Sequence, residues 1–315
     1  MKEGHLPVLV EEVITMLAPA PGSLQIDATV GGGGHTERIL EATNPDGRLL
    51  GLDADGAAIA RVDARLRPRY GDRLVLRRAN FRELKDVAPD AGFGAVDGML
   101  FDLGLSSFQL VDTDRGFGIR AGGPLDMRFD TSRGVPAAEL LATLDADELT
   151  ALFRRFGEEP NARRIARAIV DARATSPVAT SEELASLVER VSPGNPRVRR
   201  RIHPATRVFQ ALRIAVNEEL DALQDGLAAA VDLLRPGGRL VVLSYHSLED
   251  RIVKRFLDAE RKGCICPPEL PVCVCGRSPR LRLVTKPSLT PTDAEIAENP
   301  RARSARLRAA ERMAA

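Results

Sequence analysis

The stretch LQIDATVGGGGHT, residues 24–36, decides the fold of this 315-residue chain. Its first four residues, Leu24–Asp27, predict a short buried strand that ends in an acid, and four consecutive glycines follow at Gly31–Gly34. A helix-like run then extends from Thr36 to Ala42. A strand, a glycine-rich turn and a helix in this order let the backbone approach a ligand closely, with the helix N-terminus behind it.

Strand-like and helix-like segments alternate through much of the rest of the chain. Strands are predicted at 48–53, 74–76, 96–101 and 239–244, and helices at 57–66 and 220–234. This alternation is typical of βαβ units. We therefore predict an α/β fold with a Rossmann-like core and a mostly parallel twisted sheet, in which a ligand binds at the carboxyl ends of the strands.

The pattern changes between about Asp112 and His203, where strand signals vanish. Helices are predicted at 137–144, 147–156, 161–174 and 181–191, the last one behind a capping box at Thr180–Glu183. We expect a discontinuous core of 1–111 and 206–315, interrupted by an all-helical inserted domain at 112–205 that recognises the substrate. The tail from Pro287 onward is rich in Pro, Ala and Arg and is expected to be partly extended.

Charge and hydropathy limit the partners of the chain. The net charge of +1 gives no global electrostatic attraction to nucleic acid, so phosphate contacts must come from local clusters. Arginines cluster near the end of the insertion (Arg197, Arg199, Arg200, Arg201, Arg207) and in the tail (Arg301, Arg303, Arg306, Arg308, Arg312). Each cluster contacts RNA phosphates or forms a solvated basic face. With no signal peptide and no apolar run of membrane-spanning length, we expect a cytoplasmic protein without a membrane partner.

The four cysteines form two C-x-C pairs, Cys264 with Cys266 and Cys273 with Cys275. They are too closely spaced for a disulfide framework. Four thiolates in so short a loop can bind structural zinc, although the usual spacing has two or more intervening residues. The alternative is four reduced thiols in a surface loop, and the sequence alone assigns no metal.

Groups suited to binding a nucleoside follow several predicted strands. The glycine loop lacks the third glycine of G-x-G-x-x-G, because the sixth position from Gly31 is Thr36, and this argues against a nicotinamide-dependent oxidoreductase. Asp53 can accept hydrogen bonds from the ribose hydroxyls of a dinucleotide or of S-adenosylmethionine. Alternatively, the glycines form a plain loop and Asp53 caps a helix. Phe81 either contacts an adenine ring or belongs to the core, and His35 either faces the ligand or is structural.

Several longer strings occur together: HLPVL (5–9), DATVGGGGHT (27–36), DLGLSS (102–107), HPATRVFQALRI (203–214), SYHSLEDR (244–251) and NPRARS (299–304). With these strings the chain resembles, along its whole length, the bacterial ribosomal RNA small subunit methyltransferase H family, the 16S rRNA cytosine-N4 methyltransferases. The resemblance implies a methyltransferase core interrupted by a helical domain. It also implies transfer of a methyl group from S-adenosyl-L-methionine to N4 of a cytidine in the decoding region of 16S ribosomal RNA.

The resemblance implies cofactor-binding roles for the residues at the matching positions: Gly33, Gly34, His35, Asp53, Phe81, Asp102 and Gln109. Tyr245 stands where the family string has Phe. Asp102 is the candidate catalytic residue, because N4 of cytosine is a poor nucleophile and needs a group that accepts a hydrogen bond from it. The rival role for Asp102 is orientation of the cofactor alone.

The remaining chemistry concerns the base. Methylation at cytosine C5 would need a cysteine nucleophile, and no cysteine is near a strand-end motif, which favours an exocyclic nitrogen. The base is expected to be flipped into a pocket lined by Ser244, Tyr245 and His246, unless His246 is a buried, hydrogen-bonded residue. Rival functions are a non-catalytic RNA-binding ribosome assembly factor and methylation of another nucleic-acid amino group. Naked RNA and the assembled small subunit both stay open as substrate, as does the oligomeric state.

Overall fold

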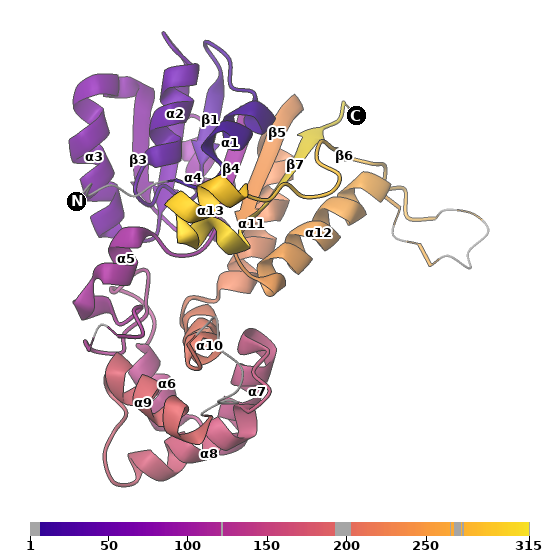
Figure 1. Ribbon diagram of the computed structural model, residues 1–315. Helices are drawn as coiled ribbons and strands as arrows, with labels where there is room; N and C mark the ends of the chain where they lie inside the picture. Colours follow the sequence, from indigo (N-terminus) through magenta and orange to yellow (C-terminus); the bar gives the residue numbers. More distant parts are fainter. Residues whose placement is uncertain are drawn as a thin grey trace. The chain divides into compact units, whose positions relative to one another are not determined.

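The computed structural model describes residues 7–120, 122–192, 203–264, 266–267, 272 and 274–314. Its contacts divide the chain into two compact units, shown in Figure 1. The first unit combines Met1–Gly104 with Leu220–Ala315, and the second is Leu105–Glu219. Several residues named from the sequence lie outside the described residues: His5, Arg197, Arg199, Arg200, Arg201 and Cys273.

The first unit is built on a seven-stranded sheet with the order β3-β2-β1-β4-β5-β7-β6. The first five strands in chain order are parallel: β1 (Leu24–Asp27), β2 (Arg48–Asp53), β3 (Leu74–Arg78), β4 (Val96–Asp102) and β5 (Leu234–Ser244). The order reverses between β1 and β4, where a ligand site is expected. This topology confirms the predicted Rossmann-like α/β core.

Helices cover both faces of this sheet, and neighbouring residues of one strand serve opposite faces. Leu49, Leu100 and Val241 pack under α1 (Val10–Leu17), α2 (Gly34–Ala42) and α3 (Gly56–Tyr70). The adjacent residues Leu50, Phe101 and Val242 pack under α4 (Leu84–Asp90), α11 (Glu219–Leu233) and α12 (Ser247–Lys262). Burial on both faces explains why these strands read as continuous apolar runs. Shorter elements are η1 (Gly71–Arg73), η2 (Phe81–Glu83), α13 (Asp293–Glu298) and η4 (Pro300–Ser304).

The second unit is helical throughout its named elements. These are α5 (Ser107–Val111), η3 (Thr113–Arg115), α6 (Ala137–Thr143), α7 (Ala146–Gly157), α8 (Ala162–Arg173), α9 (Ser181–Val191) and α10 (Thr206–Asn217). The capping box at Thr180 is present, with Glu183 as its partner. The compact unit is longer than the predicted 112–205 insertion, because α10 buries Val208 and Leu212 in the same core as Phe153 of α7. Its role in substrate recognition stays a prediction.

The C-terminal tail is part of the sheet. Strand β7 (Arg306–Arg312) pairs antiparallel with both β5 and β6 (Leu281–Leu283). We predicted neither β6 nor β7. Arg308 is engaged in an ion pair with Asp250 of α12, with nitrogen–oxygen distances of 2.7 and 3.1 Å. The interpretation of the tail arginines as a solvated basic face is therefore wrong for Arg308. No helix among the described residues is long and apolar enough to cross a membrane.

Gly51 tests the packing that positions the strand ends. A Cβ added there would lie 2.6 Å from Val30 Cγ2 and 2.7 Å from Leu76 Cδ2, whereas one at exposed Gly94 would lie 3.8 Å from its nearest neighbour. We expect G51A to lower the free energy of unfolding by about 1–3 kcal/mol through overpacking, and G94A to change it by less than about 0.5 kcal/mol. Urea denaturation followed by circular dichroism measures both, and equal midpoints for the two variants would contradict the packing.

Candidate active site

The site begins with the register of three parallel strands. Asp27, the last residue of β1, lies opposite Gly51 of β2 and Leu100 of β4. Both neighbouring strands continue for two more residues, to Asp53 and Asp102, which is about 6.6 Å of extended chain. The loop after β1 therefore lies in the gap between the ends of β2 and β4, with one carboxylate on each side.

Backbone hydrogen bonds fix this loop to β2. The Val30 amide donates to the Leu52 carbonyl at 2.9 Å, and the Gly31 amide donates to Asp53 Oδ2 at 2.8 Å. The other carboxylate oxygen of Asp53 accepts from the Asp55 amide at 2.8 Å. A carboxylate has about four lone-pair positions, so Asp53 can still accept the two hydroxyls of a ribose. Burial raises the pKa of Asp53 to about 6.

The same loop is fixed to β4 on its other side. The Ala28 amide donates to the Leu100 carbonyl at 2.9 Å, and the Asp102 amide donates to Thr29 Oγ1 at 2.6 Å. The hydroxyl of Tyr245, just after β5, donates to Asp102 Oδ1 at 2.7 Å. Burial raises the pKa of Tyr245 well above its usual value, so the phenol keeps its proton and remains a donor. The loop after β1 thus holds the backbone of Asp102, and Tyr245 holds its carboxylate.

His35 lies in the first turn of α2 and is only 4% exposed. Its Nε2 is 3.5 Å from Asp102 Oδ2, and neither ring nitrogen has a hydrogen-bond partner among the described residues. Burial lowers the pKa of His35 to about 4, against the opposing effect of Asp27, so the ring is neutral at pH 7. Buried polar atoms are normally hydrogen-bonded, so these orphaned nitrogens fit a site that a ligand completes.

Asp27 is the structural acid of the group. Its side chain is 1% exposed and accepts from Thr36 Oγ1 at 2.6 Å and from the Thr29 amide at 3.2 Å. These bonds connect the end of β1 to the start of α2. Burial raises the pKa of Asp27, while Thr36 and the nearby His35 lower it. Asp27 therefore supports the loop from beneath.

Gly33 and Gly34 are required by packing. Gly33 is the N-cap of α2 with φ +76°, and a Cβ there would lie 2.9 Å from Val62 Cγ2 of α3. A Cβ on Gly34 would lie 2.8 Å from Pro7 Cγ. The two glycines thus let α2 begin close to its neighbours, and their contact with a cofactor stays a prediction.

Phe81 and Gln109 are two further predicted cofactor-binding residues, and their described contacts are with residues other than the strand-end acids. Phe81 begins η2 after β3 and packs edge-on against Phe101, with 5.6 Å between ring centroids, so at least part of its ring belongs to the core. Gln109 belongs to the second unit, where its side chain accepts from the Ser106 amide in the capping box of α5. Cofactor contacts of both residues stay predictions.

His246 fits the alternative role that we left open for it. It is the N-cap of α12, where Nδ1 accepts from the Glu249 amide and Glu249 Oε2 accepts from the His246 amide. Nε2 lies 3.1 Å from Glu249 Oε1. His246 is thus a capping residue through Nδ1, while its buried Nε2 has no hydrogen-bond partner among the described residues, and its contact with a base stays a prediction. Sequence reasoning missed the contacts that the hydroxyls of Thr29, Thr36 and Tyr245 make. The only signal for them in the sequence was the tyrosine at position 245, where the family string has Phe.

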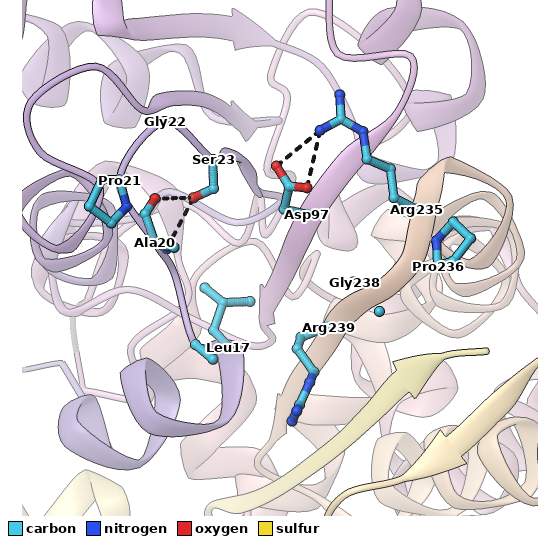
Figure 2. A pocket seen from close by; sticks show the side chains of 12 residues that line it. Leu17, Ala20, Pro21, Gly22, Ser23, Asp97, Arg235, Pro236, Gly238 and Arg239 are labelled. Atoms are coloured by element: carbon cyan, nitrogen blue, oxygen red, sulfur yellow. Dashed lines mark hydrogen bonds and ion pairs between the residues drawn. The ribbon is translucent and has the colours of Figure 1, made fainter. Parts of the chain in front are cut away.

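A hollow at the other end of the sheet is separate from this group. Figure 2 shows its lining at the amino ends of the strands, where Arg235 faces Asp97 of β4. Asp97 also accepts from the Leu24 amide at 2.7 Å, and Arg239 pairs with Glu311 at 2.8 Å. These pairs tie β1, β4, β5 and β7 together. We therefore interpret the residues around the hollow as structural, because they join neighbouring strands at the end of the sheet opposite to Asp53 and Asp102.

The raised pKa of Asp53 predicts a pH-dependent affinity for S-adenosylmethionine. Ribose hydroxyls donate to the ionised carboxylate, which with a pKa of about 6 is about nine-tenths populated at pH 7 and about one-tenth at pH 5. We expect the dissociation constant to rise about tenfold between pH 7 and pH 5, measured by calorimetry. D53N should bind weakly at both values, and a D53N variant that kept the same pH dependence would assign it to another group.

Comparison with known proteins identifies the family of the chain. The model of the MraW methylase family matches residues 2–313. The Ribosomal RNA small subunit methyltransferase H of Thermomicrobium roseum is 57% identical over 98% of this chain and 94% of that protein. The protein of the same name from Syntrophotalea carbinolica is 52% identical over 98% of each chain. A solved rRNA methylase from Streptococcus thermophilus has a TM-score of 0.44 at 10% identity, covering 97% of this chain and 94% of that chain, which is too distant to add to the assignment. The chain belongs to the MraW methylase family of S-adenosylmethionine-dependent methyltransferases.

Proposed function

We propose that this protein transfers a methyl group from S-adenosylmethionine to N4 of a cytidine in the decoding region of 16S ribosomal RNA. The names of its relatives, Ribosomal RNA small subunit methyltransferase H, support a small-subunit RNA substrate. The observation that carries the proposal is the oriented carboxylate of Asp102 at the end of β4, held by Tyr245 and beside the orphaned ring of His35.

The residues around the glycine loop fit the methyl donor. S-adenosylmethionine supplies a methyl group on a positively charged sulfur. Asp53 would accept its ribose hydroxyls, and the ring nitrogens of His35, which have no hydrogen-bond partner among the described residues, would offer polar contacts. The carboxylate of Asp102 would add negative charge close to a cationic ligand.

Burial distinguishes Asp102 from Asp27, whereas Asp53 is partly exposed like Asp102. The side chain of Asp102 is 15% exposed, whereas Asp27 is 1% exposed and holds Thr29 and Thr36. Asp53 holds the amides of Gly31 and Asp55. Because we assign Asp53 to the ribose of the cofactor, we propose that Asp102 is the acid that meets an incoming base.

Cytosine N4 needs help because its lone pair is delocalised into the ring. Asp102 would accept a hydrogen bond from the amino group, so that the nitrogen lone pair turns toward the methyl group, and would then take the proton that N4 releases. Holding the two reacting atoms in line adds several kcal/mol to the rate enhancement. Tyr245 keeps one carboxylate oxygen in place during this step, while the other oxygen lies on the side of His35.

The positions of the described cysteines argue against methylation at a ring carbon. Cys264, Cys266 and Cys275 follow α12, whose 16 residues carry the chain about 24 Å from its start near the end of β5. None of these thiols lies at the strand ends, so none can act as a nucleophile toward a base held there.

Asp102 provides the direct test. We expect D102A to lower methyl transfer to small-subunit RNA at least about 100-fold, because a positioned acid–base group contributes about 10²–10⁴-fold. Nucleoside mass spectrometry of 16S rRNA should find N4-methylcytidine missing in cells that lack the gene, restored by the wild type and not by D102A. Transfer assays on free RNA and on assembled subunits then identify the substrate form.

The control for D102A is D90N, a change at an exposed acid at the end of α4 that should leave transfer intact. Calorimetry with S-adenosylmethionine separates the two roles of Asp102: normal binding without transfer assigns it to the base, and lost binding assigns it to the cofactor. Full transfer activity in D102A would remove Asp102 from the mechanism, and unchanged RNA in the deletion strain would refute the proposed substrate.

Tyr245 gives a finer prediction. Y245F keeps the packed ring and removes the donor to Asp102, so we expect kcat to fall about fivefold, equivalent to about 1 kcal/mol, with unchanged affinity for S-adenosylmethionine. The matched control is Y70F, because the Tyr70 hydroxyl is buried in α3 without a described hydrogen-bond partner. A Y245F enzyme with wild-type kcat would show that the hydroxyl does not position Asp102.

A further inference from the structure

The loop between α12 and β6 gathers three thiols that the methyl transfer does not use. The Sγ atoms of Cys264, Cys266 and Cys275 all lie within 4.8 Å of one another. Cys264 and Cys275 are 11 positions apart in the sequence, yet their sulfur atoms are 3.8 Å apart. We propose that these three cysteines bind a structural zinc ion that holds this loop together.

The sulfur separation matches metal ligands rather than a covalent bond. A disulfide has its sulfurs about 2.05 Å apart, well below the 3.8 Å between Cys264 and Cys275. In a tetrahedral zinc site with Zn–S bonds of about 2.3 Å, two ligand sulfurs are about 3.8 Å apart. The observed pair therefore has the spacing of one edge of such a tetrahedron, and Cys266 lies within reach of a further corner.

Backbone geometry holds the cluster in place. The Val274 amide donates to Cys266 Sγ at 3.4 Å. Gly263 and Gly276 flank the cluster with φ of +70° and +65°, which turns the chain sharply on either side of it. A Cβ on Gly263 would lie 2.3 Å from the carbonyl carbon of Ser278, so the two ends of the loop touch.

Hydrogen bonds and ion pairs among Glu260, Arg277 and Arg280, which we call the stem, hold the base of the loop below the cysteine cluster. The carboxylate of Glu260, near the end of α12, accepts from Arg277 at 3.1 Å and from Arg280 at 2.6 Å. The Arg280 amide donates to the Glu260 carbonyl at 2.9 Å. Arg280 and Arg277 hold the pKa of Glu260 below its usual value, so the stem stays charged and paired at neutral pH. The stem therefore holds the two ends of the loop together, and the three thiols lie in the part of the loop between those ends.

Beyond this stem the described part of the loop has no apolar core of its own. Val272 is 70% exposed and Val274 is 77% exposed. A short segment without buried side chains gains little from packing, and a metal bound by thiolates supplies ordering energy instead. Thiolate ligands favour zinc over magnesium or calcium, which take oxygen ligands. Cys273, which supplies a further thiol in the sequence, lies outside the described residues, and the fourth ligand is left open.

The test is the metal content of the full-length chain, purified without an affinity tag and under reducing conditions. Inductively coupled plasma mass spectrometry should find about one zinc per chain in the wild type and much less than one in C264S and in C275S. The matched control is V272S, a change in the same loop that should keep the zinc. Replacing zinc by cobalt should add thiolate-to-cobalt absorption in the wild type and in V272S only.

The outcomes separate this proposal from the alternatives. Circular dichroism spectra that match the wild type show that C264S and C275S have lost the metal and not the fold. Wild-type protein without zinc, whose cysteines all react at once with a thiol reagent, would overturn the site. Iron in place of zinc, or a mass two hydrogens lower that marks a disulfide, would also overturn it. Because the readout is metal content, its failure leaves the methyl-transfer proposal untouched.

Discussion

The structure depends on one constraint, which is that β1 ends two residues before its neighbours on both sides. With Asp27 opposite Gly51 and Leu100, the chain that leaves β1 can only pass between the ends of β2 and β4. Hydrogen bonds from Val30 and Gly31 on one side, and contacts of Thr29 on the other, hold it there. The register of the strands therefore brings the glycine loop and the two outer acids together, and the side chains of Asp53 and Thr29 add hydrogen bonds to the backbone pairing.

This arrangement concentrates ionisable groups where water is scarce. A buried carboxylate is stable only when hydrogen bonds or charges compensate for lost solvent. Asp27 receives a hydroxyl and an amide, and Asp53 receives two amides. Asp102 receives the phenol of Tyr245. Each acid is thus stabilised by groups from a different segment, which couples the shape of the site to the folding of the whole unit.

The parts of the fold and site that follow local pattern were predictable from sequence. Strands β1 and β2 have the predicted bounds, because buried parallel strands read as short apolar runs ending in polar residues. Strand β7 was missed because its buried residues, Leu307 and Ala309, alternate with arginines that resemble a basic tail. The bond from Tyr245 to Asp102 joins residues 143 positions apart, and only the folded sheet brings them together. Placing α10 likewise required knowing which core its apolar face joins.

The neutral state of His35 favours binding of the positively charged methyl donor in the proposed reaction. A positively charged donor binds less well beside a second positive charge, so an imidazolium at this position would weaken binding. Burial prevents this by lowering the pKa of His35 to about 4, although Asp27 favours the charged form. The first turn of α2 acts in the same direction, because a helix N-terminus disfavours a cation. The neutral ring of His35 can therefore offer hydrogen bonds without opposing the positive charge of the ligand.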